Sequence, residues 1–249
     1  MTSLAELQAN WDRLGEDDPL WAILANPKMR GNRWDEERFF ASGREEIAAL
    51  LGDLEQRGIR VNRGAALDFG CGVGRLTQAL GDHFGEASGV DIAPSMVAKA
   101  EGYNRHGERC RYFVNGRDDL RLFPAESFDL VCSFIVLQHI APRFAERYIR
   151  EFVRVLRPGG VLVFQIPDRP APTLKGWFLH LLSRRPFLPL LNLYRRVRDG
   201  SRGVAEMHAI PKARVLAILE ECGAEVLACE TNGRAGRTWI SHMYIVSRP

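Results

Sequence analysis

The stretch ALDFGCGVGRLTQAL, residues 66–80, decides the fold of this chain. An apolar run ends at Asp68, alternate glycines stand at 70, 72 and 74, and apolar residues at helical spacing follow at once. This pattern predicts a buried strand that turns tightly into a helix. Glycines suit a turn whose backbone is left-handed or closely approached by a ligand. A ligand site is one interpretation, and a turn that only needs compact backbone is the other.

The composition indicates an ordinary globular protein of 249 residues, with 46% hydrophobic and 26% charged residues. The net charge of +3 is too small to predict a nucleic-acid partner. We see neither an N-terminal signal peptide nor a run of about eighteen apolar residues that would predict a membrane span. The five cysteines contain no CxxC pair, which favours a reducing cytoplasm over a disulfide framework or a structural zinc site.

Residues 1–64 read as helices broken by turns, and from residue 65 strands and helices alternate. The predicted strands are residues 65–70, 86–92, 110–115, 127–137, 160–166, 224–230 and 238–247. The predicted helices between them are residues 75–84, 94–104, 142–156 and 211–223. Such alternation predicts right-handed crossovers and a parallel sheet. The last two strands have no helix between them, so we expect them to pair as an antiparallel hairpin.

The acids at the ends of the first two strands indicate what binds above the glycine turn. Ligands of an open α/β sheet bind beyond the carboxyl ends of the strands, where the strand order reverses. The third glycine stands one residue earlier than in a dinucleotide site, and Arg75 takes its place, which disfavours an NAD-dependent oxidoreductase. Asp68 suits a cation better than a pyrophosphate, and Asp91 has the spacing of a ribose-binding acid. A cationic nucleoside without phosphate, S-adenosylmethionine, fits this pattern.

Four stretches carry a family resemblance: LDFGCGVGRLTQAL (67–80), GVDIAPSMVAKA (89–100), FPAESFDLVCSFIVLQHI (123–140) and LRPGGVLVFQIP (156–167). Their order and spacing resemble the motifs of class I S-adenosylmethionine-dependent methyltransferases, and the tail at 211–249 resembles that family's last helix and hairpin. The resemblance implies a Rossmann-like α/β fold, whose seven-stranded, mostly parallel sheet has the order 3-2-1-4-5-7-6. The last strand is antiparallel, and helices cover both faces.

The resemblance also implies a set of cofactor-binding residues, grouped by the part of the cofactor they contact. These are Asp68, Gly70, Cys71, Gly72 and Gly74 at the methionine portion, Asp91 at the ribose, Ile92 and Met96 at the adenine ring, Asn115, Gly116 and Arg117 at the adenine amino group, and Phe134, Ile135 and Gln138 at the methionine and sulfonium. The segment after the third strand departs from the family's commoner Gly-Asp pattern, so Asp118 is an alternative for the adenine contact.

Methyl transfer from a sulfonium is an in-line displacement that yields S-adenosylhomocysteine, and a hydroxyl acceptor must also lose its proton. Histidine is the usual base. His139 ends the fourth strand beside the expected sulfonium, and its alternative role is structural. His208 precedes the last crossover helix, and its alternative is an exposed loop residue. Asp168 is either a substrate contact or an ordinary turn acid. No cluster of metal-ligating residues is visible, so we expect no metal.

Two segments outside the motifs complete the predicted domain organisation. We expect residues 1–64 to form an N-terminal helical segment that covers the cofactor site of a methyltransferase domain at 65–249. The helix at 32–47 is the candidate cover, and simple packing of Trp34 and Phe39 on the sheet is the alternative. A basic apolar insert at 169–210 forms a lid. Its residues 169–202 hold eight lysines or arginines and one aspartate, so peripheral membrane contact and an oligomer contact are alternatives.

The expected activity is S-adenosylmethionine-dependent methyl transfer to a small molecule, with O-methylation of a sugar, polyketide or lipid-linked glycan favoured by the candidate base alone. An N- or C-methyltransferase that works by proximity is the first alternative. A catalytically silent cofactor-binding protein is the second. Acceptor-dependent release of S-adenosylhomocysteine separates the enzyme from the silent binder, because both would bind the cofactor.

Overall fold

The computed structural model describes residues 3–172 and 206–249, and within them the chain forms one seven-stranded sheet. The strands are β1 (Ala65–Phe69), β2 (Glu86–Asp91), β3 (Cys110–Val114), β4 (Phe128–Ser133), β5 (Leu156–Pro170), β6 (Glu225–Asn232) and β7 (Trp239–Ser247). Their order in the sheet is β3-β2-β1-β4-β5-β7-β6, as predicted. The first five strands pair in parallel, and β7 lies antiparallel to both β5 and β6.

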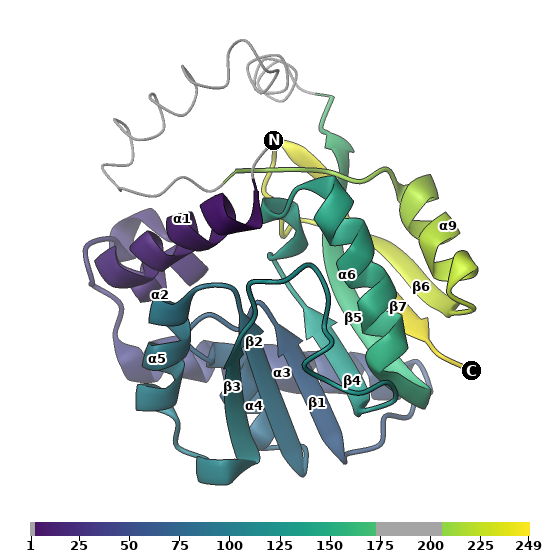
Figure 1. Cartoon of the computed structure of the whole chain (residues 1–249), viewed down its shortest axis with the longest axis horizontal. Coiled ribbons are helices and arrows are strands. Elements are labelled where there is room, and N and C mark those ends of the chain that lie inside the picture. The colour runs from purple at the N-terminus through teal and green to yellow at the C-terminus, as the bar shows by residue number, and fades with distance from the viewer. Residues whose placement is uncertain (1–2, 173–205) are drawn as a thin grey trace.

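Helices cover both faces of this sheet, with α6 in front and α3 and α4 behind in Figure 1. The helices are α1 (Leu4–Asp17), α2 (Pro19–Ile23), α3 (Glu36–Gln56), α4 (Arg75–Gly81), α5 (Pro94–Tyr103), α6 (Pro142–Val155) and α9 (Lys212–Glu221), and short 3₁₀ turns lie at Pro27–Met29, Gly107–Arg109 and Leu137–His139. Helix α6 shows why these helices pack on the sheet. Its buried residues Ala145, Tyr148, Ile149 and Phe152 recur at helical spacing and form one apolar stripe.

The two faces of the sheet hold separate apolar cores. Phe152 of α6, Leu219 of α9 and Tyr244 of β7 belong to the core on the front face. Ile47 of α3 and Leu80 of α4 belong to the core behind the sheet. Every residue of β4 is buried, which is what the nearly continuous apolar run in the sequence predicts for a strand covered on both sides.

Strand β5 is longer than the sequence predicts, because it continues through Pro167 to Pro170. Its pairing with β4 ends at Phe164, and beyond that point it pairs with β7 alone, with a register shift between Pro167 and Arg169. Proline is tolerated where one side of a strand needs no ladder bond, so this extension behaves as an edge strand.

Most of the predicted insert at 169–210 lies outside the described residues, since only 169–172 and 206–210 of it are described. Among the residues that the structure describes, no helix is both long and apolar enough to cross a membrane.

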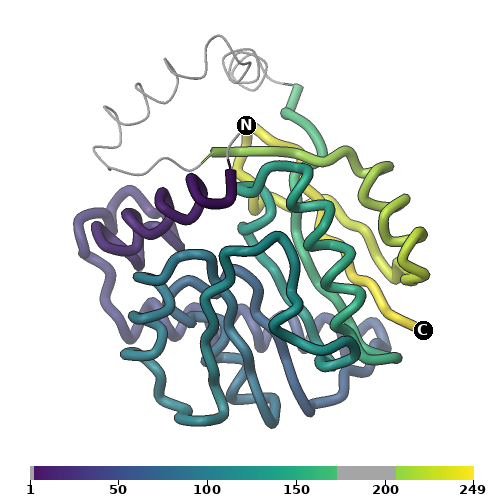
Figure 2. The backbone as a smooth tube through the Cα atoms, in the orientation of Figure 1, coloured from purple at the N-terminus to yellow at the C-terminus, as the bar shows by residue number. Residues whose placement is uncertain are grey.

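Helix α1 lies across one end of the sheet (Figure 2) and is held there by polar contacts to α5 and to Ile92, the residue after β2. The backbone N–H of Ser95 donates to Asp12 Oδ1 at 2.7 Å, and Ser95 Oγ donates to the Asp12 carbonyl oxygen at 2.8 Å. The N-cap residue of α5 is Ala93, whose side chain cannot accept a hydrogen bond, so Asp12 supplies the missing acceptor. Gln8 Nε2 donates to the Ile92 carbonyl oxygen at 2.8 Å. The N-terminal segment is therefore fixed beside the carboxyl end of β2.

Candidate functional site

The glycine turn between β1 and α4 needs glycine for two physical reasons at once. Gly70, Gly72 and Gly74 have φ values of 80°, 53° and 83°, in the left-handed region that other residues rarely adopt. A Cβ at Gly70 would stand 2.2 Å from Val136 Cγ2, and a Cβ at Gly72 would stand 2.5 Å from Ile23 Cδ1. The turn is thus both strained for other residues and closely approached by neighbouring side chains.

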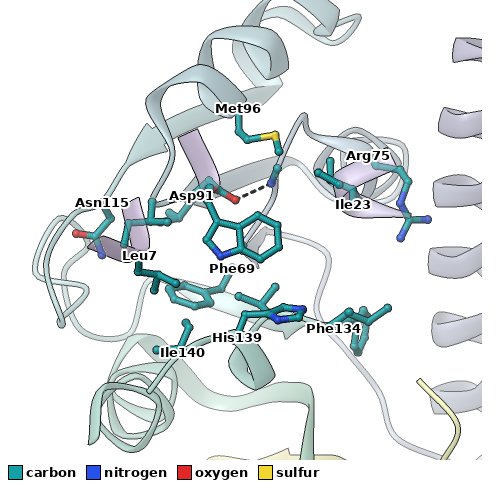
Figure 3. Close-up of a pocket in the computed structure, with 18 of the residues that line it drawn as sticks. Leu7, Ile23, Phe69, Arg75, Asp91, Met96, Asn115, Phe134, His139 and Ile140 are labelled. Carbon is teal, nitrogen blue, oxygen red and sulfur yellow. Dashed lines mark hydrogen bonds between the residues drawn. The ribbon is translucent and has the colours of Figure 1, made fainter. Parts of the chain in front are cut away.

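A pocket lies above this turn, and many of the residues predicted from the sequence line it. Figure 3 shows Asp91 and His139 on opposite walls, with Asn115 at one end and Phe134 at the other. The predicted residues that line the pocket are Gly70, Gly72, Asp91, Ile92, Met96, Asn115, Phe134, Ile135 and His139. The walls are mostly apolar, which is the usual character of a small-molecule site with a few placed polar groups.

Asp91 is the best-defined polar group of the pocket. Its Oδ2 accepts a hydrogen bond from the Gly72 N–H at 2.9 Å, and its Oδ1 accepts one from the Ala93 N–H at 2.9 Å. Burial raises the pKa of this carboxyl, while the backbone N–H donors act in the opposite direction. Each carboxylate oxygen has a second lone pair, so Asp91 can still accept hydrogen bonds from two hydroxyls. The donor set and the glycine cradle fit the ribose of a nucleoside cofactor.

Asp68 does not direct its carboxylate into the pocket as the sequence suggested. It is 2% exposed, and its Oδ2 accepts a hydrogen bond from Thr77 Oγ1 of α4 at 2.8 Å. Burial raises the pKa of Asp68 to about 6. Other predicted cofactor contacts also lie outside the pocket lining: Cys71, Gly74, Gly116, Arg117 and Gln138. Asp118, the alternative adenine contact, forms an ion pair with Arg147 instead.

His139 lines the pocket with both ring nitrogens engaged. Its Nδ1 lies 2.6 Å from the Glu206 carbonyl oxygen, and its Nε2 lies 3.1 Å from Gln138 Nε2. A carbonyl oxygen can only accept, so Nδ1 carries the proton, and Nε2 of the neutral ring accepts from the Gln138 amide. Nε2 is therefore the nitrogen that can take up a further proton. The indole of Trp11 contacts the same ring edge-on, with 5.2 Å between centroids.

His208 has a different environment and does not line the pocket. Its backbone N–H donates to the Gln138 carbonyl oxygen at 2.7 Å, and its Nε2 lies 3.3 Å from Glu206 Oε2. The stretch from Glu206 to His208 thus holds the loop that carries Gln138 and His139. Of the two candidate bases, the structure brings only His139 to the pocket.

The helix that the sequence offered as a cover, residues 32–47, is not the one that reaches the pocket. Phe39 is fully buried and Trp34 packs against it, with 5.7 Å between ring centroids, so the alternative of simple packing describes them. The N-terminal residues that line the pocket come from α1, from α2 and from the residue that follows α2. They are Leu7, Trp11, Ala22, Ile23 and Leu24. Leu7 and Trp11 stand one helical turn apart, which is the one sequence signal that they share a face. Tyr148 of α6 also lines the pocket and was not predicted.

Comparison with known proteins finds a family match for the central part of the chain. A family model described as a methyltransferase domain matches residues 67–164. These residues are therefore similar to a methyltransferase domain. The matched region runs from β1 into β5 and includes the glycine turn, Asp91 and His139. The observed strand order is the one that the resemblance to class I methyltransferases implied, so the domain has the class I fold.

Curated relatives of the methyltransferase domain differ in the atom they methylate. The chain is 32% identical over 160 residues to a ubiquinone biosynthesis O-methyltransferase of Xanthomonas axonopodis pv. citri, covering 64% of this chain and 56% of that protein. It is 28% identical over 123 residues to phosphoethanolamine N-methyltransferase 3 of Arabidopsis thaliana, covering 49% of this chain and 24% of that protein. The chain therefore spans from about a quarter to just over half the length of these two relatives.

A solved structure matches nearly the whole chain. Magnesium protoporphyrin IX methyltransferase from Synechocystis PCC 6803, solved with bound S-adenosylhomocysteine, has a TM-score of 0.62 and 17% sequence identity. The likeness covers 98% of this chain and 99% of that one. At this identity the match supports the fold of the methyltransferase domain and its N-terminal segment, and leaves the acceptor open.

Proposed function

We propose that the chain transfers a methyl group from S-adenosylmethionine to a small-molecule acceptor. The observation that carries this proposal is the arrangement of Asp91 at the left-handed glycine turn, with its two carboxylate oxygens fixed by the Gly72 and Ala93 N–H groups. In the proposed organisation, residues 65–249 form the catalytic domain and residues 1–64 cover its cofactor site.

The pocket has groups suited to each part of this cofactor. Asp91 would hold the ribose hydroxyls, Ile92 and Met96 would flank the adenine, and Asn115 lines one end of the pocket (Figure 3). The turn at Gly70 and Gly72 would lie against the methionine portion. Ile23 and Val136 close against these glycines, so an incoming cofactor would displace their side chains. When bound, S-adenosylmethionine supplies the activated methyl group on its sulfonium.

The chain's own contribution would be alignment, exclusion of water and removal of one proton. The walls formed by Trp11, Ile140 and Phe134 are apolar and keep the reacting groups in a largely dry site. For a hydroxyl acceptor, we assign proton removal to His139 Nε2. The Glu206 carbonyl oxygen holds the Nδ1 proton and so fixes this tautomer, and the Gln138 amide would have to release Nε2 first.

The acceptor that suits this pocket best is neutral and largely apolar, with a hydroxyl group. Apart from His139, the described lining residues contain one acid, Asp91, and one guanidinium, Arg75, whose charged end points away from the pocket centre in Figure 3. Nothing among them would neutralise a charged acceptor. O-methylation of a polyketide or lipid-linked sugar fits this character. N-methylation by proximity is the second candidate, since one of the relatives named above is an N-methyltransferase.

The test is transfer of labelled methyl from S-adenosylmethionine to pools of candidate acceptors, with release of S-adenosylhomocysteine measured in parallel. Hydroxylated apolar pools should become labelled and should raise product release above the level without acceptor. Asp91→Ala is the negative control, because this substitution removes the proposed ribose contact. Cofactor binding without acceptor-dependent release across all pools would favour the silent cofactor-binding protein.

A further inference from the structure

A second cavity lies behind the sheet, between α3, α4 and the turn that follows α5. Arg44 of α3, then Arg75, Gln78 and Asp82 at α4, and Arg105 and His106 of the turn line it, and its volume is about 240 Å³. Arg75 is the one described residue that lines both this cavity and the pocket above the glycine turn. The methyl-transfer proposal assigns no role to the cavity.

Two hydrogen-bond donors on the wall of this cavity have no hydrogen-bond partner among the described residues. Gln78 is 7% exposed, and its Oε1 accepts from the Arg105 N–H at 3.1 Å, which fixes the orientation of the amide and leaves Nε2 unpartnered. Arg75 is 6% exposed; its Nη1 donates to Ser42 Oγ and its Nη2 to Glu46, while Nε has no partner. Buried donors are nearly always paired in proteins, so two unpaired donors on one cavity wall point to a missing acceptor.

The charges around the cavity also leave positive charge in excess. Arg44 and Arg105 both bond to Glu37, at 2.8 Å and 3.1 Å. Arg75 bonds to Glu46 at 2.7 Å, and Arg234 bonds to the same carboxylate. Each carboxylate is thus shared by two guanidinium groups. Burial acts to raise the pKa of Glu46, but Arg75 and Arg234 outweigh it and hold that pKa below its ordinary value.

One acid opposes this excess. Asp82 lines the cavity at the C-terminal end of α4, and its Oδ1 lies 3.5 Å from His106 Nε2. The lining therefore carries three arginines and one acid, because the carboxylates bonded to these arginines, Glu37 and Glu46, do not line the cavity, so an anion inside it would meet mainly donors.

We propose that this cavity binds a phosphate group. A tetrahedral oxyanion offers several acceptor oxygens to the amide of Gln78 and to the planar guanidinium forks of Arg44 and Arg105, which is the geometry that arginine matches best. The phosphate belongs either to free inorganic phosphate or to a small phosphomonoester. The proposal is independent of the methyl-transfer proposal, because it concerns different residues apart from Arg75.

The test is calorimetric titration of the full chain with inorganic phosphate and, in a second arm, with ribose 5-phosphate, each against chloride at the same ionic strength. We expect saturable binding of at least one phosphate form, and the tighter arm identifies the source of the phosphate. Gln78→Glu keeps the acceptor for the Arg105 N–H and replaces the free amide donor with a carboxylate oxygen, so it should weaken binding at least tenfold.

Arg105→Gln is the second variant, because its side chain is 63% exposed and its loss leaves the core intact. It should weaken binding several-fold. The matched control is Arg111→Gln, which removes an exposed arginine on β3 that pairs with Glu86 of β2 and should bind like the wild type. Absence of saturable binding to the wild type in both arms, or equal binding by the wild type and both cavity variants, would overturn the proposal. Binding of S-adenosylhomocysteine, measured separately, tests the methyl-transfer site alone.

Discussion

Asp68→Asn should make the chain more stable at neutral pH while weakening its hold on the cofactor. The carboxyl of Asp68 is 2% exposed and is hydrogen-bonded to the Thr77 hydroxyl, and burial raises its pKa from 3.8 to about 6. The folded chain therefore binds a proton more tightly than the unfolded chain. Stability from this group is fully present below pH 3.8 and is lost as the pH rises through 6.

The size of the effect follows from the shift of about two pKa units. At 1.36 kcal/mol per unit, keeping Asp68 ionised at pH 7 costs the folded state roughly 3 kcal/mol. An asparagine removes that cost, and its amide oxygen can still accept from Thr77. The variant should thus gain up to about 3 kcal/mol in free energy of unfolding at pH 7, and almost nothing at pH 3.5.

The assay is urea unfolding of the wild type and the variant across pH 3.5 to 8. Asp17→Asn on the exposed end of α1 is the control, and it should change stability by less than about 0.5 kcal/mol at any of these pH values. S-adenosylhomocysteine should bind the Asp68 variant more weakly at pH 7, because a buried negative charge two residues before the glycine turn is lost. A stability gain that does not depend on pH, or no gain at pH 7, would refute the assignment of a buried, high-pKa carboxyl.

Three further predictions concern other parts of the chain. His139→Ala should lower turnover per folded molecule by ~10²–10⁴-fold with little change in cofactor affinity, and turnover within a few-fold of wild type would show that His139 is not the base. Asp12→Ala removes the acceptor that caps α5 and should cost ~1 kcal/mol in urea unfolding; an unchanged midpoint would show that α1 does not stabilise that helix end. If residues 169–202 contact anionic membranes, vesicle binding should fall steeply with salt, since charges are screened over ~8–10 Å; equal binding to neutral vesicles would leave only the lid or an oligomer contact.

Much of the fold could be predicted because its signals are local. The apolar run of β4, the glycine turn and the proline that opens α5 each specify their own element within a few residues. The extension of β5 could not be predicted, since Pro167 and Pro170 normally end a strand. They are tolerated because the last part of β5 pairs only with β7, and that pairing depends on a strand some seventy residues away in sequence.

The location of a site residue could be predicted where its position in a motif also determines where its side chain lies. Asp91 ends a strand next to a turn that donates an N–H to it, so its place follows from the backbone. The predicted direction of the Asp68 side chain was wrong. Its carboxylate accepts a hydrogen bond from Thr77 of the helix that packs on the strand, and this contact depends on how the helix packs. Leu7 and Trp11 were missed as lining residues, because an apolar helix face has the same pattern whether it packs on a core or borders a cavity. The unpaired donor of Gln78 depends on α3 and the turn after α5, and no local pattern reveals it.

The most direct measurement is calorimetric binding of S-adenosylhomocysteine to the wild-type chain and to Asp91→Ala. The wild type should bind one molecule saturably. Loss of a charge-assisted contact, worth ~1.5–3 kcal/mol per hydrogen bond, should weaken the variant at least tenfold while the fold survives. Equal affinity of the two proteins, with both folded, would contradict the placement of a nucleoside cofactor above the glycine turn.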